Sequence, residues 1–181
     1  SHEELLAQPQ IDAVVIAVPT GYHEPVAALA LAARIPVLLE KPMARTVAQC
    51  HELINHAAKT NTLLMVAHCR RYDAYWQLWG EYVKAGHLGS PVLWRDVLAN
   101  TGHGQWFLDD ELGGGPLLDG AIHNYDFANW IFGEPDSVVA SAIKLNPNVS
   151  AVDTGTAVVR YKSGHQLLIS WSWATKGARL H

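Results

Sequence analysis

The sequence predicts an α/β chain in which a parallel sheet with helices is followed by an α+β unit with a mostly antiparallel sheet. Up to about residue 70, short apolar runs, the first of them rich in β-branched residues, alternate with longer segments of helical composition or spacing. This alternation is typical of parallel strands joined by helices. After residue 70, several runs alternate between apolar and polar residues and are separated by turn residues, which is typical of hairpins. Of the 181 residues, 49% are hydrophobic and 17% are charged, so the chain can bury a core.

The first part of the chain is predicted to contain three strands and two helices in alternation. The strands are expected at residues 12–18, 36–39 and 63–67, and the helices at 23–34 and 46–59. Thr46 is expected to cap the second helix. We expect the first strand to be buried on both faces, as parallel strands usually are. Right-handed connections then give a parallel layer.

The second part is predicted to be of mixed type. Helices are expected at residues 74–85 and 116–132, strands at 92–99, 137–144, 154–162 and 166–174, and an irregular segment at 101–115. In the last strand Leu167, Ile169, Trp171 and Trp173 alternate with other residues, so they share one face. We place the domain boundary near residues 68–71, which gives domains at 1–69 and 70–181, the second incomplete at its carboxyl end.

Charge and cysteine content exclude several classes of protein. The net charge is −4 and the basic residues are scattered, which argues against a nucleic-acid partner. The apolar runs are too short to cross a bilayer, and the first residues do not resemble a signal peptide. Cys50 and Cys69 form no CxxC motif, which favours a reducing compartment. We therefore expect a cytoplasmic protein with no membrane partner.

Two polar clusters follow predicted parallel strands. The segments Val18–His23 and Glu40–Pro42 each come directly after a strand, where ligands bind in open α/β sheets. A lysine in such a place is often a surface residue whose stem covers apolar atoms. Because polar residues follow two strand ends that meet at one crevice, a functional role for Lys41 is the better interpretation.

A third cluster lies at the start of the helix predicted at 116–132. Asp119 and His123 are four residues apart, so a regular helix places them on one face, with Asp126 near the same stripe. A carboxylate beside an imidazole orients the ring for general acid–base catalysis. The alternative is a partly buried histidine that packs a helix on a sheet. A metal site with His68 or His103 is the less favoured interpretation, because structural zinc usually has cysteine or further histidine ligands; we expect no metal.

These clusters resemble the motifs of one family. The run Ile11–His23, then Leu38–Pro42, then Gly113–His123 resembles the glucose–fructose oxidoreductase/inositol dehydrogenase (Gfo/Idh/MocA) family in order and spacing. The resemblance implies that the first part is the carboxyl-terminal half of a Rossmann-type parallel sheet. It also implies an NAD- or NADP-dependent oxidoreductase that acts on a secondary alcohol of a sugar or cyclic polyol. A homo-oligomer formed through the sheet of the second domain is implied as well.

The resemblance also implies a role for each site residue. Lys41, Asp119 and His123 would be catalytic, with His123 taking the hydroxyl proton and Lys41 stabilising the developing alkoxide. Substrate would be held by Asp119 and His123, and also by Arg70. Trp106 is a further candidate for substrate binding, because it lies in the irregular segment that we expect to line the pocket. The cofactor would be bound by Pro19, Thr20, His23, Glu40, Lys41 and Pro42, and a cis peptide at Lys41–Pro42 is implied.

One expected feature of a dinucleotide-binding domain does not occur in this sequence. No Gly-x-Gly-x-x-Gly motif, which holds the pyrophosphate at a helix N-terminus, is present. We therefore expect an internal piece of a longer protein, whose first strand is an apolar edge that self-associates. Two alternatives are a non-catalytic nucleotide- or sugar-binding protein and a remnant that dimerises through the Leu167–Trp173 face.

Overall fold

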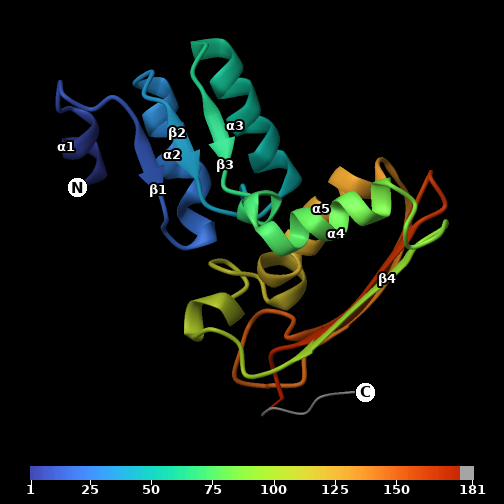
Figure 1. The fold of residues 1–181 in the computed structure, drawn as a ribbon. Helices are drawn as coiled ribbons and strands as arrows, with labels where there is room; N and C mark the ends of the chain where they lie inside the picture. The colour runs from blue at the N-terminus through green and yellow to red at the C-terminus, as the bar shows by residue number, and fades with distance from the viewer. Residues whose placement is uncertain (176–181) are drawn as a thin grey trace. The chain divides into compact units, whose positions relative to one another are not determined.

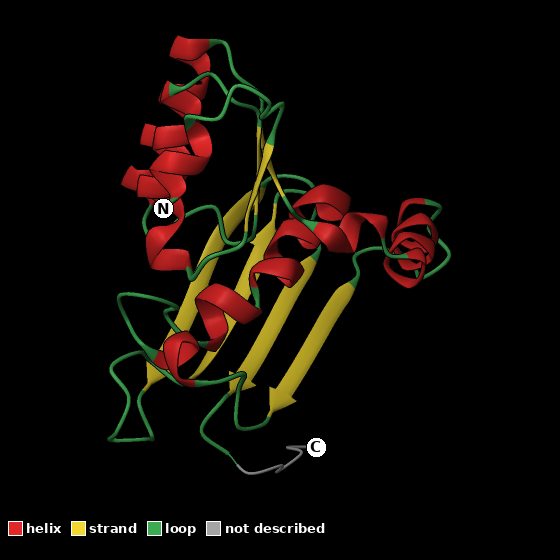
Figure 2. Cartoon of the chain, turned by 90° about the vertical axis from the view of Figure 1, so that its left-hand side faces the viewer, coloured by secondary structure: helices red, strands yellow, loops and turns green. Residues whose placement is uncertain are grey.

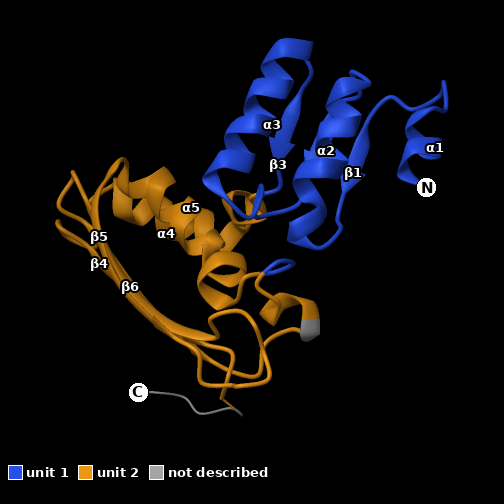
Figure 3. Ribbon diagram, turned by 180° about the vertical axis from the view of Figure 1, so that it is seen from behind, with its two compact units in different colours: residues 1–67, 111–113 blue, residues 68–110, 114–181 orange. Residues whose placement is uncertain are grey.

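The computed structural model describes residues 1–175, apart from the side chain of Gln105 (Figure 1). The chain divides into two compact units, coloured separately in Figure 3. Unit 1 contains residues 1–67 and the short segment 111–113, and unit 2 contains residues 68–110 and the chain from Gly114 onward. Among the described residues, no helix combines the length and the apolar character needed to cross a membrane.

Unit 1 is a parallel sheet with helices, as predicted. Its strands β1 (Val14–Ile16), β2 (Val37–Leu39) and β3 (Leu64–Val66) pair in the order β1-β2-β3, and its longer helices are α2 (His23–Ala32) and α3 (Val47–Thr60). Two short helices complete it, α1 (His2–Leu6) and the 3-10 turn η1 (Thr20–Tyr22). Strand β1 lies at the edge of this sheet, which is the position expected from the sequence.

Local capping explains where two of these helices begin. The Thr46 hydroxyl accepts a hydrogen bond from the Gln49 backbone, and the Gln49 side chain accepts one from the Thr46 backbone. This reciprocal pair satisfies donors that a helix start leaves open, so the N-cap predicted at Thr46 is confirmed. The sequence interpretation missed α1, although Ser1 and Glu4 form the same capping box.

Only one face of the three-stranded sheet is buried. Leu31, Leu39 and Leu53 form the centre of its core and are fully buried. On the other face Val15 is 70% exposed, and its cross-strand neighbour Leu38 is exposed as well. The expectation that the first strand is buried on both faces was therefore wrong, because α2 and α3 pack on the face that carries Ile16 and Leu39.

Unit 2 contains a four-stranded sheet, and helices pack on it (Figure 2). Its strands are β4 (Leu93–Ala99), β5 (Pro135–Ile143), β6 (Thr154–Tyr161) and β7 (Gln166–Ser172), in the order β4-β7-β6-β5. Of the described strand pairs in this sheet only β4–β7 is parallel, so the predicted mostly antiparallel sheet is confirmed. The helical segments are η2 (Cys69–Tyr72), α4 (Ala74–Lys84), η3 (Gln105–Leu108), η4 (Pro116–Gly120) and α5 (Ile122–Phe132).

The alternation predicted for the last strand points into the core of unit 2. Leu167 and Ile169 are fully buried and belong to the same apolar cluster as Phe127 of α5. Trp173 is only 2% exposed. The proposal that this face dimerises was therefore wrong, because the unit's own helices cover it. An oligomer formed through this sheet, which stays an expectation, would need the opposite face.

The helix predicted at residues 116–132 begins differently from a regular α-helix. Pro116–Gly120 (η4) forms a π-helical turn, in which the Ala121 amide donates to the Pro116 carbonyl at 2.8 Å. The regular helix α5 starts only at Ile122. Single π-helical turns are rare and occur frequently at functional sites.

Candidate active-site residues

The carboxyl ends of β1 and β2 bring two of the predicted clusters to one edge of unit 1. Strand β1 ends at Ile16 and β2 at Leu39, and the last backbone bond between them runs from the Glu40 amide to the Ile16 carbonyl at 2.9 Å. Because the strands are parallel neighbours, the segments 18–23 and 40–42 both leave the sheet at this edge. This is where α/β sheets bind ligands.

The Thr20 side chain has an unusual environment at this edge. It is 2% exposed, and its hydroxyl has no hydrogen-bond partner within the described part of the chain. A buried hydroxyl without a partner carries a desolvation cost. It therefore offers a donor and an acceptor to a ligand that reaches the strand end, which fits a polar cofactor such as a nicotinamide.

His23, the first residue of α2, is 1% exposed. Its Nδ1 lies 2.7 Å from the Pro42 carbonyl oxygen, and its Nε2 lies 2.9 Å from the Val18 carbonyl oxygen. Both ring nitrogens are thus occupied by backbone atoms of the two strand ends. The Lys41–Pro42 peptide bond, which comes shortly after the end of β2, is cis, as the resemblance implied.

Residues 111–113 belong to unit 1 and pack against η1. The Gly21 amide donates to the Leu112 carbonyl at 2.9 Å. A Cβ atom at Gly21 would collide with the Glu111 carbonyl oxygen, so only glycine fits this approach. Arg45 also contacts this segment, with its guanidinium 3.4 Å from the Gly113 carbonyl oxygen. The sequence interpretation missed Arg45, and it included Gly21 in the Val18–His23 cluster without a role of its own; the Thr-Gly pair after a strand is the signal that could have given Gly21 one.

Asp119 and His123 lie in unit 2, whereas Lys41 lies in unit 1. Asp119 is 3% exposed and sits in the π-helical turn η4, and His123 is half-buried in the first turn of α5. The turn changes the helical geometry between them, so the regular four-residue spacing does not describe their relationship. Gly120 makes this turn possible, because a Cβ there would collide with the Trp171 ring.

Asp126 forms an ion pair with Arg71. Its carboxylate accepts hydrogen bonds from Nε, at 2.8 Å, and from a terminal nitrogen of the guanidinium. His68 Nδ1 lies 3.6 Å from the same carboxylate. The hydrogen bond with Asp126 raises the pKa of Arg71 above its ordinary value. Among the described residues, no group of three or more His, Cys, Asp or Glu side chains is placed to hold a metal ion.

The two predicted substrate-binding residues outside this helix have structural neighbours. The Arg70 guanidinium lies 3.2 Å from the Asp73 carboxylate and 5.5 Å from the centre of the Trp76 ring. The Trp106 ring stacks on Phe107 at 3.7 Å between centroids. Both side chains remain partly accessible, so neither arrangement prevents contact with a ligand.

The described chain thus combines a parallel sheet that has a polar carboxyl edge with an α+β unit that has a mostly antiparallel sheet. Comparison with known families agrees. Residues 1–68 match the family model "Oxidoreductase family, NAD-binding Rossmann fold", and residues 76–181 match the "GFO/IDH/MocA C-terminal domain". The chain belongs to the Gfo/Idh/MocA family of NAD-binding oxidoreductases.

Several curated relatives are similar to this chain. Inositol 2-dehydrogenase 1 of Saccharopolyspora erythraea is 33% identical over 129 residues, which is 71% of this chain and 37% of the relative. Myo-inositol 2-dehydrogenase of Thermotoga maritima is 29% identical over 89% of this chain and 49% of its own length. The chain therefore spans less than half the length of these relatives.

Solved structures show the same fold. The WlbA dehydrogenase of Bordetella pertussis, crystallised with NADH and UDP-GlcNAcA, superposes with a TM-score of 0.89 at 27% identity, covering 99% of this chain and 54% of that one. GenD2 from gentamicin A biosynthesis, in complex with NAD, also gives a TM-score of 0.89 at 26% identity, over 98% of this chain and 52% of its own.

Proposed function

We propose that the full-length protein transfers a hydride between NAD(P) and a secondary alcohol of a sugar or cyclic polyol. The observation that carries the proposal is the edge of unit 1. There Thr20, whose hydroxyl has no hydrogen-bond partner among the described residues, and Lys41 follow two neighbouring parallel strands. The substrate class is supported by relatives named inositol dehydrogenases and by WlbA, crystallised with a nucleotide sugar acid.

On the cofactor side, Pro19, Thr20, Glu40, Lys41 and Pro42 would hold the nicotinamide end. The bound nicotinamide would supply the hydride acceptor for alcohol oxidation. The Thr20 hydroxyl would form a hydrogen bond with a polar group of the cofactor, since it forms none with any described residue. The Glu40 carboxylate accepts a hydrogen bond from the Lys41 amide at 3.2 Å, which helps to fix the backbone at Lys41.

On the substrate side, we propose that His123 accepts the proton of the reacting hydroxyl as the hydride leaves the adjacent carbon. Lys41 would stabilise the negative charge that develops on the oxygen. Asp119, buried in its π-helical turn, would accept a hydrogen bond from a second substrate hydroxyl. Arg70 and Trp106 would contact more distant parts of the substrate, a guanidinium and a ring being suited to hydroxyl groups and sugar faces respectively.

The test is turnover of the full-length protein on a panel of sugars and cyclic polyols with NAD and with NADP, followed at the nicotinamide absorbance. We expect Lys41→Met and Asp119→Asn to lower kcat by roughly 100-fold or more, as expected for groups that act on developing charge or hold the reacting atoms. Lys59→Met, which changes an exposed lysine in the last turn of α3, should keep full activity.

Two outcomes would count against this proposal. Unchanged turnover in Lys41→Met or Asp119→Asn would remove that residue from the mechanism. Tight binding of a nucleotide or sugar without turnover on any member of the panel would instead favour a non-catalytic binding protein.

A further inference from the structure

We propose that His23 is a positioning residue, which ties the end of β1 to the end of β2 and so fixes the backbone that carries Lys41. This role differs from the direct cofactor contact that the family resemblance implies. The importance of the role rests on the proposed dehydrogenase function. The contacts that support it lie entirely within unit 1.

The His23 ring links β1 and β2 beyond the last backbone hydrogen bond between them. The last backbone bond between β1 and β2 joins the Glu40 amide to the Ile16 carbonyl. Beyond this point the His23 ring contacts one carbonyl oxygen from each segment, that of Val18 after β1 and that of Pro42 after β2. The ring lies between them, 2.9 Å from one oxygen and 2.7 Å from the other. The side chain thus acts as one more rung between the strands.

Few side chains can fill this position. Both partners of the ring are carbonyl oxygens, which only accept hydrogen bonds, and the two ring nitrogens point in different directions. An imidazole with a proton on each nitrogen donates to both oxygens, whereas a neutral ring donates to only one of them, because its other nitrogen is an acceptor. Asparagine and glutamine carry both donors on a single nitrogen, so neither reproduces the span.

The backbone of His23 is held rigidly. His23 is the first residue of α2, and the helix is fixed in the core of unit 1 by Ala27, Ala30 and Leu31, each at most 1% exposed. Lys41 is consequently held on both sides: the Glu40 carboxylate accepts from its amide, and His23 holds the carbonyl of the next residue. Loss of the ring would free that second side.

The test compares His23→Ala and His23→Asn with Ala27→Gly in the full-length protein. Ala27 is buried one turn further along α2, and its replacement weakens the helix by about 1 kcal/mol without touching either carbonyl. We expect His23→Ala to lower kcat roughly tenfold to 100-fold, as a misplaced catalytic group does, with the KM for NAD(P) changed less than threefold. His23→Asn should recover part of the loss, and Ala27→Gly should keep wild-type kcat.

Two kinetic results would overturn the proposal. A raised KM for NAD(P) with unchanged kcat would show that His23 contacts the cofactor. An equal loss of kcat in Ala27→Gly would show that general weakening of α2 is sufficient.

A second measurement does not depend on activity. Protein labelled with 15N-histidine should show a slowly exchanging ring N–H proton that disappears in His23→Ala, because a buried ring donates to a carbonyl. Absence of this signal in the wild type would overturn the proposed role of His23 even if the enzyme is active. Conversely, a protein that shows the signal but turns over no substrate would contradict the dehydrogenase function, and the link that His23 forms between the two strand ends would still stand.

Discussion

The Arg71 guanidinium and the Asp126 carboxylate form a two-pronged ion pair that joins η2 to α5. The Asp126 side chain is 9% exposed and that of Arg71 is 41% exposed. Fork-to-fork pairs of this kind are geometrically specific and stronger than neutral hydrogen bonds. The pair thus holds the Cys69–Tyr72 turn, which also carries Arg70, against the helix that carries His123.

A double-mutant cycle on Arg71→Gln and Asp126→Asn should give a coupling energy of about 1 kcal/mol in the free energy of unfolding, since one partner is largely buried. The exposed pair of Lys162 and Glu134, at 2.7 Å, serves as the control and should give no more than about 0.5 kcal/mol. Equal coupling in the two cycles, measured by urea unfolding, would contradict the structural role of the Arg71–Asp126 pair.

Gly120→Ala should destabilise unit 2 by about 1–3 kcal/mol, as overpacking in a dense interior does. The added Cβ would push against the six-membered ring of Trp171. That ring cannot move freely, because its Nε1 donates to the Asp96 carboxylate at 2.8 Å. In a Trp171→Leu background the cost of Gly120→Ala should shrink. A cost that stays the same in both backgrounds would place its origin in the backbone of the turn instead.

We expect the raised pKa of Tyr161 to cause a loss of stability at alkaline pH. Burial, with a smaller contribution from Tyr125, raises the pKa of Tyr161 from its usual value near 10 to about 12. The unfolded chain then loses this proton before the folded chain does, so the stabilisation is complete below pH 10 and disappears as the pH rises toward 12. The total is about 2–3 kcal/mol. In Tyr161→Phe the free energy of unfolding, measured between pH 9 and 12, should fall less steeply with pH than in the wild type. An equally steep fall in the variant would mean that other groups cause the loss of stability.

Much of the fold was predictable because it depends on local signals. Short apolar runs predicted β1, β2 and β3, and the Thr46 cap predicted the residue at which α3 starts. The exposure of Val15 was not predictable, since it depends on which face the helices cover. The π-helical turn at Asp119 also escaped prediction, because the packing of Gly120 on Trp171 comes from a strand about fifty residues further along the chain. Among candidate site residues, His23 was found from its place after a strand, but its partners depend on the tertiary structure.

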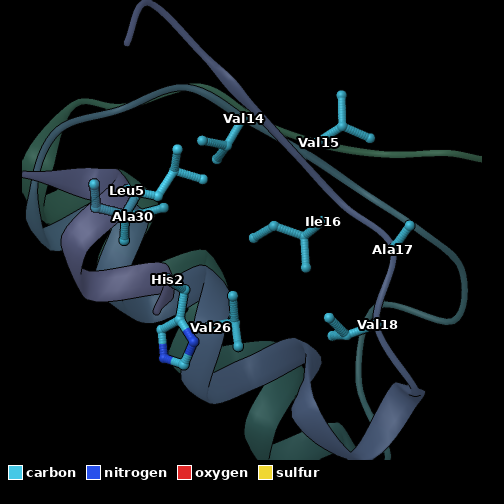
Figure 4. Close-up of a pocket in the computed structure, with 10 residues that line it drawn as sticks. His2, Leu5, Val14, Val15, Ile16, Ala17, Val18, Val26 and Ala30 are labelled. Carbon is cyan, nitrogen blue, oxygen red and sulfur yellow. The ribbon is translucent and has the colours of Figure 1, made fainter. Parts of the chain in front are cut away.

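The free edge of β1 should make this chain self-associate. An apolar pocket runs along that strand between α1 and α2, with Val14 and Ile16 on its wall (Figure 4). Because β2 is the one described strand that pairs with β1, the other side of β1 presents backbone groups that pair with no described strand. Val15→Lys, at a site that is 70% exposed, should preserve the fold and reduce association in sedimentation experiments. A wild-type chain that stays monomeric at high concentration would refute this expectation.

Thr20→Val should separate stability from cofactor binding. The Thr20 hydroxyl is buried with no hydrogen-bond partner among the described residues, so its removal should leave the unfolding free energy unchanged or raise it by up to about 1 kcal/mol. Thr156→Val is the matched control, because that hydroxyl lies 3.0 Å from the Ser170 hydroxyl and its loss should cost about 1 kcal/mol.

The same Thr20→Val change should weaken NADH binding to the full-length protein about tenfold, which corresponds to one lost hydrogen bond of about 1.4 kcal/mol. Titration of the nicotinamide fluorescence gives this affinity, and Thr156→Val should leave it unchanged. A variant that gains stability and loses affinity would identify the buried hydroxyl as a group kept for the cofactor. A variant that is destabilised and still binds NADH normally would mean that Thr20 serves the fold alone, and would remove it from the cofactor site.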